Sequence, residues 1–211
     1  MQAKFITIEG TEGVGKTTNI EFIQNWLSQR GVEFISTREP GGTPLAEQVR
    51  ELLLTPREEK VGDATELLLM FAGRAQHLDQ VILPALNSGS SVLCDRFTDA
   101  SYAYQGFGRE MDCSLIAQLE QIVQGDLRPD LTLILDIPVE IGLKRASERS
   151  TPDRFEQEKI EFFDRVRHGY LKIAEDNPGR CAVIDASQSL EEVQASIEAV
   201  LENFYSQPSA T

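Results

Sequence analysis

The run FITIEGTEGVGKTT, residues 5–18, passes from a β-branched stretch through three closely spaced glycines into a polar segment. Residues 5–9 predict a buried strand, and residues 16–29 predict a helix. The segment GTEGVGKT, residues 10–17, matches the phosphate-loop pattern, in which successive backbone N–H groups turn inward around the phosphates of a nucleotide. Because this segment lies between a predicted strand and the start of a predicted helix, the sequence predicts a nucleotide-binding α/β domain.

The side chains of the loop add charge and a metal ligand to this backbone cradle. Lys16 supplies a positive charge for the phosphates, and the Thr17 hydroxyl would hold Mg²⁺. The full set of residues expected to contact the nucleotide in this loop is Gly10, Thr11, Glu12, Gly13, Val14, Gly15, Lys16, Thr17 and Thr18.

Five short β-branched runs recur along the chain, and each is followed by a stretch long enough for a helix. The runs occupy residues 5–9, 33–37, 91–95, 131–137 and 181–185. The helical patterns occupy residues 16–29, 45–54, 65–86, 114–123, 139–148, 156–175 and 190–205. This alternation predicts a three-layer phosphate-loop NTPase fold, with a parallel five-stranded sheet and helices on both faces. The fourth run is apolar nearly throughout, which predicts a strand in the middle of the sheet.

Length and charge limit the remaining possibilities. The 211 residues suit a single domain, which we expect to span residues 1–205, with a frayed tail at 206–211. The formal net charge of −14 argues against partners such as nucleic acid or an anionic membrane. Three widely spaced cysteines and the lack of a leader or spanning segment predict a cytoplasmic protein.

Two further segments carry chemistry. After the third predicted strand comes Asp95-Arg96-Phe97, where Asp95 can order Mg²⁺-bound water and Arg96 can hold a phosphate. The segment ERSTPD, residues 148–153, joins two predicted helices and is flanked by basic residues. It is either a solvated helix connection or a mobile basic flap over an anionic ligand. The absence of the N-K-x-D guanine-reading string and of D-x-x-G after a strand argues against a guanine-nucleotide switch.

Several strings, taken in order, resemble the bacterial thymidylate kinase family over nearly the whole chain. The strings are IEGTEGVGKTT from Ile8, TREPGGT from Thr37, DRF from Asp95, AYQG from Ala103, RPDLTLILD from Arg128, GLKR from Gly142 and DRFEQE from Asp153. The resemblance implies transfer of the γ-phosphoryl group of ATP to dTMP with Mg²⁺, with ATP and dTMP as substrates, and a homodimer.

The resemblance also implies roles for residues of the acceptor site. Glu12 would turn away from ATP toward the 3′-hydroxyl of dTMP. The dTMP phosphate would be bound by Arg38 and Arg96, with Arg50 near the same pocket. The wall of this pocket would be shaped by Glu39 and Pro40, and completed by Ser101, Tyr104 and Gln105.

Base recognition falls on the predicted helix at residues 65–86. Arg74 would donate to a carbonyl of the base, and an aromatic side chain would stack on it. The family usually places that aromatic four residues before the Arg, where this chain has Met70, whereas Phe71 lies three residues before it. Both offsets lie on the same side of a helix, so we expect Phe71 to contact the base.

The resemblance favours the flap interpretation of the segment at residues 145–155, which we expect to be a lid. Arg149 would be its principal transition-state cation, with Arg145 and Arg154 assisting at ATP. The expected catalytic set is Glu12, Lys16, Arg96 and Arg149. Two alternatives stay open: a nucleoside monophosphate kinase of different base preference, or a nucleotide-dependent switch without a small-molecule acceptor.

Overall fold

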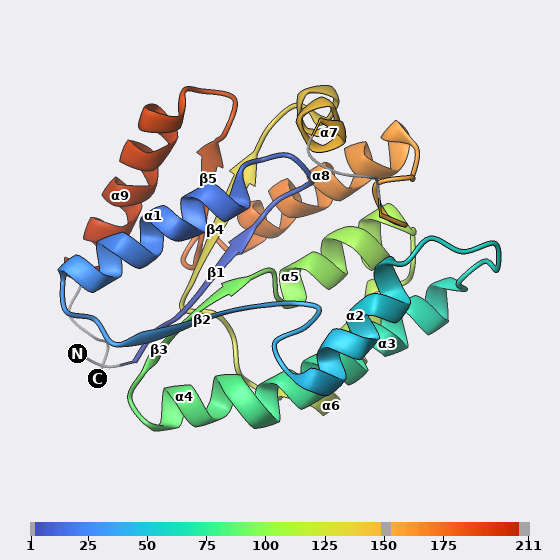
Figure 1. The fold of residues 1–211 in the computed structure, drawn as a ribbon, viewed down its shortest axis with the longest axis horizontal. Helices are drawn as coiled ribbons and strands as arrows, with labels where there is room; N and C mark the ends of the chain where they lie inside the picture. Colours follow the sequence, from blue (N-terminus) through green and yellow to red (C-terminus); the bar gives the residue numbers. More distant parts are fainter. Residues whose placement is uncertain (1–2, 149–152, 207–211) are drawn as a thin grey trace.

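Five parallel strands form the centre of the molecule (Figure 1). The structure is a computed structural model that describes residues 3–148 and 153–206. In chain order the strands are β1 (Phe5–Glu9), β2 (Phe34–Arg38), β3 (Ser91–Asp95), β4 (Leu131–Asp136) and β5 (Cys181–Asp185). Their order across the sheet is β2-β3-β1-β4-β5, so the predicted five-stranded parallel sheet is confirmed. The apolar run at residues 131–137 forms an interior strand, next to the central β1.

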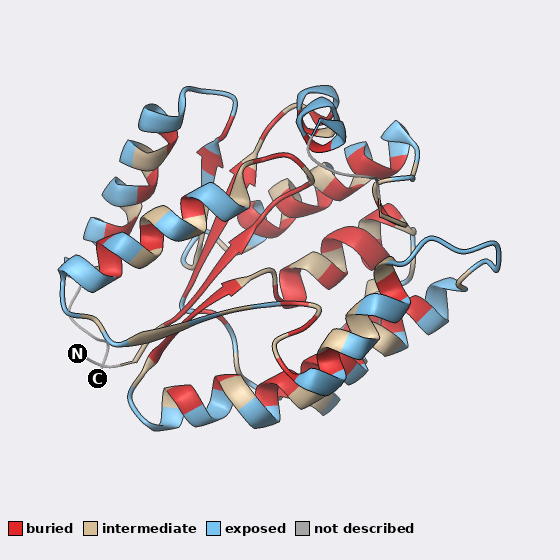
Figure 2. Cartoon of the chain, viewed as in Figure 1, coloured by how far each residue is buried: buried red, intermediate tan, exposed pale blue. Residues whose placement is uncertain are grey.

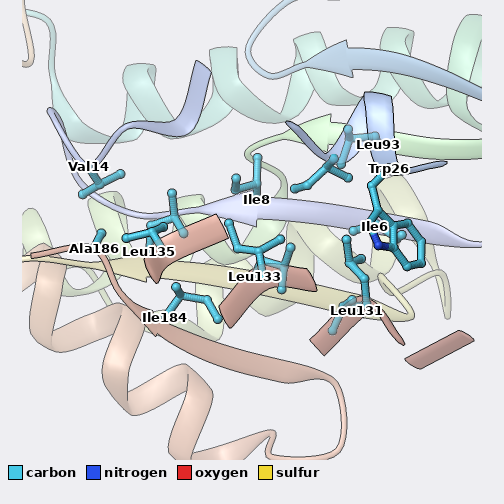
Figure 3. Packing of buried hydrophobic residues seen from close by; sticks show 14 of the residues in the cluster. Ile6, Ile8, Val14, Trp26, Leu93, Leu131, Leu133, Leu135, Ile184 and Ala186 are labelled. Atoms are coloured by element: carbon cyan, nitrogen blue, oxygen red, sulfur yellow. The ribbon is translucent and has the colours of Figure 1, made fainter. Parts of the chain in front are cut away.

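Alternation along β1 separates two hydrophobic layers. Ile6 and Ile8 belong to a cluster (Figure 3) that α1 (Lys16–Gln29) and α9 (Leu190–Ser206) cover from one side. The side chain of Phe5 points to the opposite face, which has its own cluster. A strand buried on both sides of the sheet is nearly inaccessible throughout, and Figure 2 shows the central strands coloured as buried.

The second face is covered by helices from three parts of the chain. One long helical run consists of α3 (Asp63–His77), a π-helical turn at Leu78–Ile82 and α4 (Leu83–Asn87). The second part is the helical run at residues 98–108, and the third is α8 (Ile160–Asp176), which packs on that run and on β4. Figure 1 shows α1 and α9 on one side of the sheet and the α3–α4 run on the other. This arrangement confirms the predicted three layers.

The remaining helices agree with the periodicity, with two differences. They are α2 (Pro44–Leu54), α6 (Cys113–Gln124) and α7 (Val139–Ser147). The helix expected from residue 156 begins only at Ile160, because the Asp153 carboxylate accepts the backbone N–H groups of Phe155 and Glu156 in a preceding turn. The helical run formed by α5 (Thr98–Ser101) and the π-helical segment Tyr102–Gly108 was not predicted from the sequence.

The carboxyl ends of β1 and β3 lie side by side at the centre of the sheet. The connections from these two strands run to opposite faces, which makes this edge the expected ligand crevice of an open α/β sheet. Both chemistry-bearing motifs, at residues 10–17 and 95–97, start from it. Among residues 3–148 and 153–206, no helix is both long and apolar enough to cross a bilayer.

Candidate active site

The phosphate loop leaves β1 in a conformation that only its glycines adopt without strain. Gly10, Gly13 and Gly15 have φ angles of 135°, 71° and 87°. A Cβ atom on Gly10 would lie 2.5 Å from the carbonyl oxygen of Leu135 on β4. A Cβ atom on Gly13 would lie 1.9 Å from the carbonyl oxygen of Gly142 on α7. The loop is thus held between a strand and a helix, and the glycines are required by contact as well as by φ.

Lys16 folds back over this loop. Its Nζ donates to the carbonyl oxygens of Gly10 at 3.1 Å and Thr11 at 3.0 Å. Desolvation, and after it the charge of Arg96, lower the pKa of Lys16 to about 8, against the opposing carboxylates of Asp95 and Glu12. A phosphate group that replaced the two carbonyls would raise the pKa of this amine.

Glu12 points away from the interior of the loop and toward a cation and a phenol. Its carboxylate accepts from Arg96 Nη2 at 2.9 Å and from the Tyr104 hydroxyl at 2.8 Å. Arg96 also donates to the Tyr104 oxygen at 2.8 Å and has a φ of 66°, which is unusual for a residue with a side chain. The three groups form a closed triangle between the phosphate loop and the pocket described next.

The two expected metal ligands differ in their surroundings. Asp95 Oδ1 is buried and, among the described residues, has no hydrogen-bond partner, although it lies near Lys16 and Arg96. Thr17 is exposed in the first turn of α1. A buried carboxylate oxygen without a partner and an exposed hydroxyl are both oxygen ligands of the kind that a hydrated divalent cation binds.

A pocket of about 530 Å³, partly open to solvent, begins at Glu12 and Arg96. Its walls carry apolar side chains from α2, α3, the α5 segment and the end of the lid region. The lining residues are Glu12, Glu39, Pro40, Arg50, Leu54, Met70, Arg74, Arg96, Phe97, Ala100, Ser101, Tyr104, Gln105, Asp153 and Phe155. Nine sequence-predicted acceptor residues therefore meet in one pocket, namely Glu12, Glu39, Pro40, Arg50, Arg74, Arg96, Ser101, Tyr104 and Gln105.

Arg74 is the most buried cation of this pocket. Its Nε donates to Glu39 Oε2 at 2.7 Å, and its Nη2 donates to the Ser101 hydroxyl at 3.1 Å and to the Phe97 carbonyl at 3.2 Å. Its Nη1 is buried and has no hydrogen-bond partner among the described residues. A buried donor without a partner in the wall of a pocket is suited to a ligand acceptor atom.

The structure places Phe71, the residue expected to contact the base, outside the lining of this pocket. Phe71 is buried in a cluster with Leu67 and Ile116, and it lies under the Arg74 guanidinium, 4.6 Å from ring centroid to Cζ. Met70 lines the pocket instead. Positions three and four residues before Arg74 differ by about 100° around a helix, which is enough to place one side chain in the core and the other in the pocket.

The expected phosphate-binding arginines separate in the structure. Arg50 lines the pocket and donates to the Pro40 carbonyl at 2.9 Å. Its pKa is lowered by burial and then by the charges of Arg38 and Arg96, so three cations gather on this side of the pocket. Arg38 does not line the pocket: its side chain is 53% exposed and donates to Glu47 at 2.9 Å.

The arginines that we expected in a lid do not lie together among the described residues. Arg149 and residues 150–152 lie outside the described residues. Arg145 donates to the Ala186 carbonyl at 3.3 Å, beside the loop that follows β5. Arg154 differs from its expected place at ATP, because it donates to Glu66 Oε2 at 2.7 Å and to the Leu53 carbonyl at 2.6 Å. The fully buried Glu66 carboxylate holds this guanidinium on the acceptor side.

Glu66 is the centre of a cluster that sequence reasoning missed. Its carboxylate accepts from Gln105 Nε2 at 2.9 Å, from Arg109 at 3.1 and 3.2 Å, and from Arg154. The pocket residue Gln105 is therefore oriented by a buried carboxylate. The partners are 39, 43 and 88 positions away from Glu66 in the chain, so no local pattern could have revealed the cluster.

Two further buried groups support the site and were also missed. Glu9, the last residue of β1, accepts from the Phe97 N–H at 2.7 Å and from the Tyr170 hydroxyl at 2.8 Å. Desolvation raises the pKa of Glu9 to about 8, with Asp99 adding repulsion. His77 lies behind Glu39, with Nδ1 at 3.0 Å from Glu39 Oε1. A polar residue that ends an apolar strand or helix was the available signal for both.

Comparison with known proteins agrees with this geometry. Residues 8–197 match the thymidylate kinase family model. The chain is 60% identical over 201 residues to the thymidylate kinase of Pseudomonas putida, covering 95% of this chain and 96% of that one. It is 56% identical over 204 residues to the thymidylate kinase of Teredinibacter turnerae, covering 97% and 100%. The crystal structure of thymidylate kinase from Ehrlichia chaffeensis superposes with a TM-score of 0.78 at 37% identity, covering 95% of this chain and 100% of that chain. The chain therefore belongs to the thymidylate kinase family.

Proposed function

We infer that this protein transfers the γ-phosphoryl group of ATP to dTMP, giving ADP and dTDP. A phosphate oxygen of dTMP forms the new bond to the γ-phosphorus, and the oxygen that bridges the β- and γ-phosphorus atoms leaves with ADP. One observation carries this function: the phosphate loop and the acceptor pocket share Glu12 and Arg96 at their border. Two phosphate groups held on either side of that border would face each other in line.

Within the pocket, we assign the cations to two ends of dTMP. Arg96 and Arg50 bind its phosphate, with Arg38 at the outer rim, and the unpartnered Nη1 of Arg74 donates to a carbonyl of thymine. Met70 and Phe97 enclose the base, while Ser101 and Gln105 complete its polar edge. Glu12 and Tyr104 lie between the two ends, where the deoxyribose hydroxyl belongs.

At the phosphate loop, we assign Lys16 to the charge on the β- and γ-phosphates and residues 10–18 to the contacts with ATP. Thr17 and Asp95 would hold Mg²⁺, which neutralises charge on the transferring group when bound. We further propose that a lid at residues 145–155 supplies Arg149 as the principal transition-state cation, with Arg145 assisting from the end of α7. The three cations on one side of the pocket and the flanking basic residues support this assignment.

We also propose a cytoplasmic homodimer built from one domain at residues 1–205. Exposed apolar side chains on neighbouring helices support the dimer, since Leu52, Leu68, Leu115 and Ile122 are all at least 47% exposed on α2, α3 and α6. Free thiols at Cys94, Cys113 and Cys181 support a reducing compartment.

The test is initial-rate ADP production from ATP and Mg²⁺ with each of dTMP, dUMP, dCMP, dGMP and dAMP, beside a blank without acceptor. The proposed function predicts a strong preference for dTMP and a negligible blank. A preference for another monophosphate would replace the acceptor assignment. ATP turnover that ignored every monophosphate would favour a switch or an ATPase.

A further inference from the structure

A buried row of hydrogen bonds runs behind the acceptor pocket. It begins at Thr37 in β2, whose Oγ1 lies 2.7 Å from His77 Nε2. It continues from His77 Nδ1 to Glu39 Oε1 at 3.0 Å and ends with Arg74 Nε donating to Glu39 Oε2 at 2.7 Å. The side chains of His77, Glu39 and Arg74 are 0%, 4% and 2% exposed. Water does not compete for these bonds.

The His77 ring is held in a single orientation. A carboxylate only accepts hydrogen bonds, so Nδ1 must carry a proton, and Nε2 shares the second ring hydrogen bond with the Thr37 hydroxyl. The backbone at Gly42 closes over the ring: a Cβ atom there would lie 2.4 Å from His77 Nε2 and 2.8 Å from Thr37 Oγ1. Rotation of the imidazole would break both hydrogen bonds, with the backbone of Gly42 close against one edge of the ring.

At the other end of this row of hydrogen bonds, every nitrogen of the Arg74 guanidinium except Nη1 is held by a partner. Nε is held by Glu39, Nη2 is held by Ser101 and the Phe97 carbonyl, and the guanidinium lies over the rings of Phe71 and Phe97. Only Nη1 lacks a partner among the described residues, although it is buried and its residue lines the pocket. The direction of Nη1 is therefore fixed by the hydrogen bond between Arg74 Nε and Glu39 Oε2. Glu39 is held in turn by the hydrogen bond between its Oε1 and His77 Nδ1.

We propose that His77 is a positioning residue for base recognition: it orients Glu39, and through Glu39 it aims Arg74 Nη1 at a base carbonyl of the acceptor. This inference rests on the proposed function, because it takes the acceptor to be a pyrimidine monophosphate. His77 touches neither substrate. Its contribution is to specificity. A fixed N–H donor forms a hydrogen bond with a carbonyl oxygen but cannot form one with an amino group at the same place.

dTMP and dCMP distinguish positioning from a merely structural role. The thymine ring presents a carbonyl where cytosine presents an amino group. When the donor is misaligned, kcat/KM for dTMP should fall while that for dCMP changes little. A general loosening of the fold would instead lower both by the same factor. The ratio of the two values is therefore the readout, measured together with KM for ATP and thermal unfolding.

The decisive variant is His77→Leu, which removes both ring hydrogen bonds. We expect kcat/KM for dTMP to fall about 10- to 100-fold through KM, the usual effect of losing hydrogen bonding around a charged group, with KM for ATP unchanged. His77→Asn keeps a side-chain donor near Nδ1 and should recover most of the dTMP to dCMP ratio. The matched control is the chain's other histidine, the exposed His168, whose change to Leu should leave the ratio at the wild-type value.

If His77→Leu does not fold, Thr37→Val tests the outer bond alone and should lower the same ratio by a few fold. A folded His77→Leu that keeps the wild-type ratio, or that lowers dTMP and dCMP turnover equally, overturns the inference. A crystal structure of a folded variant gives a second readout that needs no turnover, because unmoved Glu39 and Arg74 side chains would also overturn it. Failure of the proposed function is separate, since it would show as absence of dTMP turnover in the unchanged protein.

Discussion

Gly13 and Gly142 meet backbone to backbone. A Cβ atom on Gly13 would lie 1.9 Å from the Gly142 carbonyl oxygen, and one on Gly142 would lie 2.5 Å from the Glu12 carbonyl oxygen. The phosphate loop therefore contacts α7 directly, and α7 is the helix that leads into the proposed lid. A change in the position of α7 is transmitted to the loop without an intervening side chain.

This contact makes Gly142→Ala harmful at a position where a helix ordinarily favours Ala. The added methyl should push α7 away from the loop, with an expected loss of about 1–3 kcal/mol in the free energy of unfolding and a raised KM for ATP. Gly179→Ala is the matched control, because a Cβ atom there meets nothing within 4 Å. Equal ATP KM values for Gly142→Ala and the unchanged protein would refute the contact.

Met70 and Phe71 should separate substrate binding from stability. Met70→Ala removes apolar surface from the pocket, and we expect KM for dTMP to rise about tenfold with little change in unfolding. Phe71→Ala opens a cavity beside Leu67 and Ile116 and should cost about 3–5 kcal/mol in the free energy of unfolding. The two variants are compared by urea unfolding and by dTMP titration. The reverse pattern would return the base contact to Phe71.

Glu66 should be essential to stability because its buried carboxylate forms salt bridges with the guanidinium groups of Arg109 and Arg154. Glu66→Gln leaves Arg109 and Arg154 without their shared carboxylate, and we expect a loss of about 3–5 kcal/mol in the free energy of unfolding. KM for dTMP should rise as well, since the amide leaves one acceptor oxygen for Gln105 and the two guanidinium groups, where the carboxylate offers two. The control is Glu175→Gln, an exposed partner of Lys172, which should unfold as the unchanged protein does.

Glu9 should make stability depend on pH. Its pKa is about 8 in the folded protein and 4.5 ordinarily, so the folded state binds more protons between these values. The contribution of this protonation to the free energy of unfolding is largest below pH 4.5. It decreases as the pH rises and is lost at about pH 8. Glu9→Gln, which is neutral at every pH, should therefore become more stable relative to the unchanged protein between pH 5 and 9 in urea unfolding. A constant difference across that range would show that Glu9 does not titrate there.

Periodicity was sufficient for the sheet and for most helices, because burial repeats every two residues in strands and about every 3.6 in helices. The bounds of β1, β3, β5 and α1 agree with the predicted ranges. The segment Tyr102–Gly108 was missed because Gly106 and Gly108 interrupt any helical pattern. The structure shows why Gly108 is there: a Cβ atom would lie 2.6 Å from the Phe162 ring on α8. Close packing of two helices, rather than a turn, requires this glycine.

The candidate site divides in the same way. Residues 10–18 and Asp95 with Arg96 follow strands directly, so their meeting at one edge could be predicted from the order of elements. The partners of Glu39 and Glu66 could not be predicted from the sequence. Glu39 and Arg74 are 35 positions apart, Glu66 and Arg154 are 88 positions apart, and both pairings depend on how the helices pack. Arg154 shows the limit most clearly, because a basic residue beside a lid reads as a phosphate ligand until its buried partner is known.

The bonds between Arg154 and the α2–α3 corner also fix an order of assembly. Arg154 donates its backbone N–H to Leu54 and its side chain to Leu53 and Glu66. Synthesis runs from the N-terminus, so the first 150 residues can emerge with four of the five strands while Glu66 still lacks one of its two cations. The chain thus reaches Arg154, together with Asp153 and Phe155 of the pocket wall, only after the segment at residues 10–17 and four strands have been made.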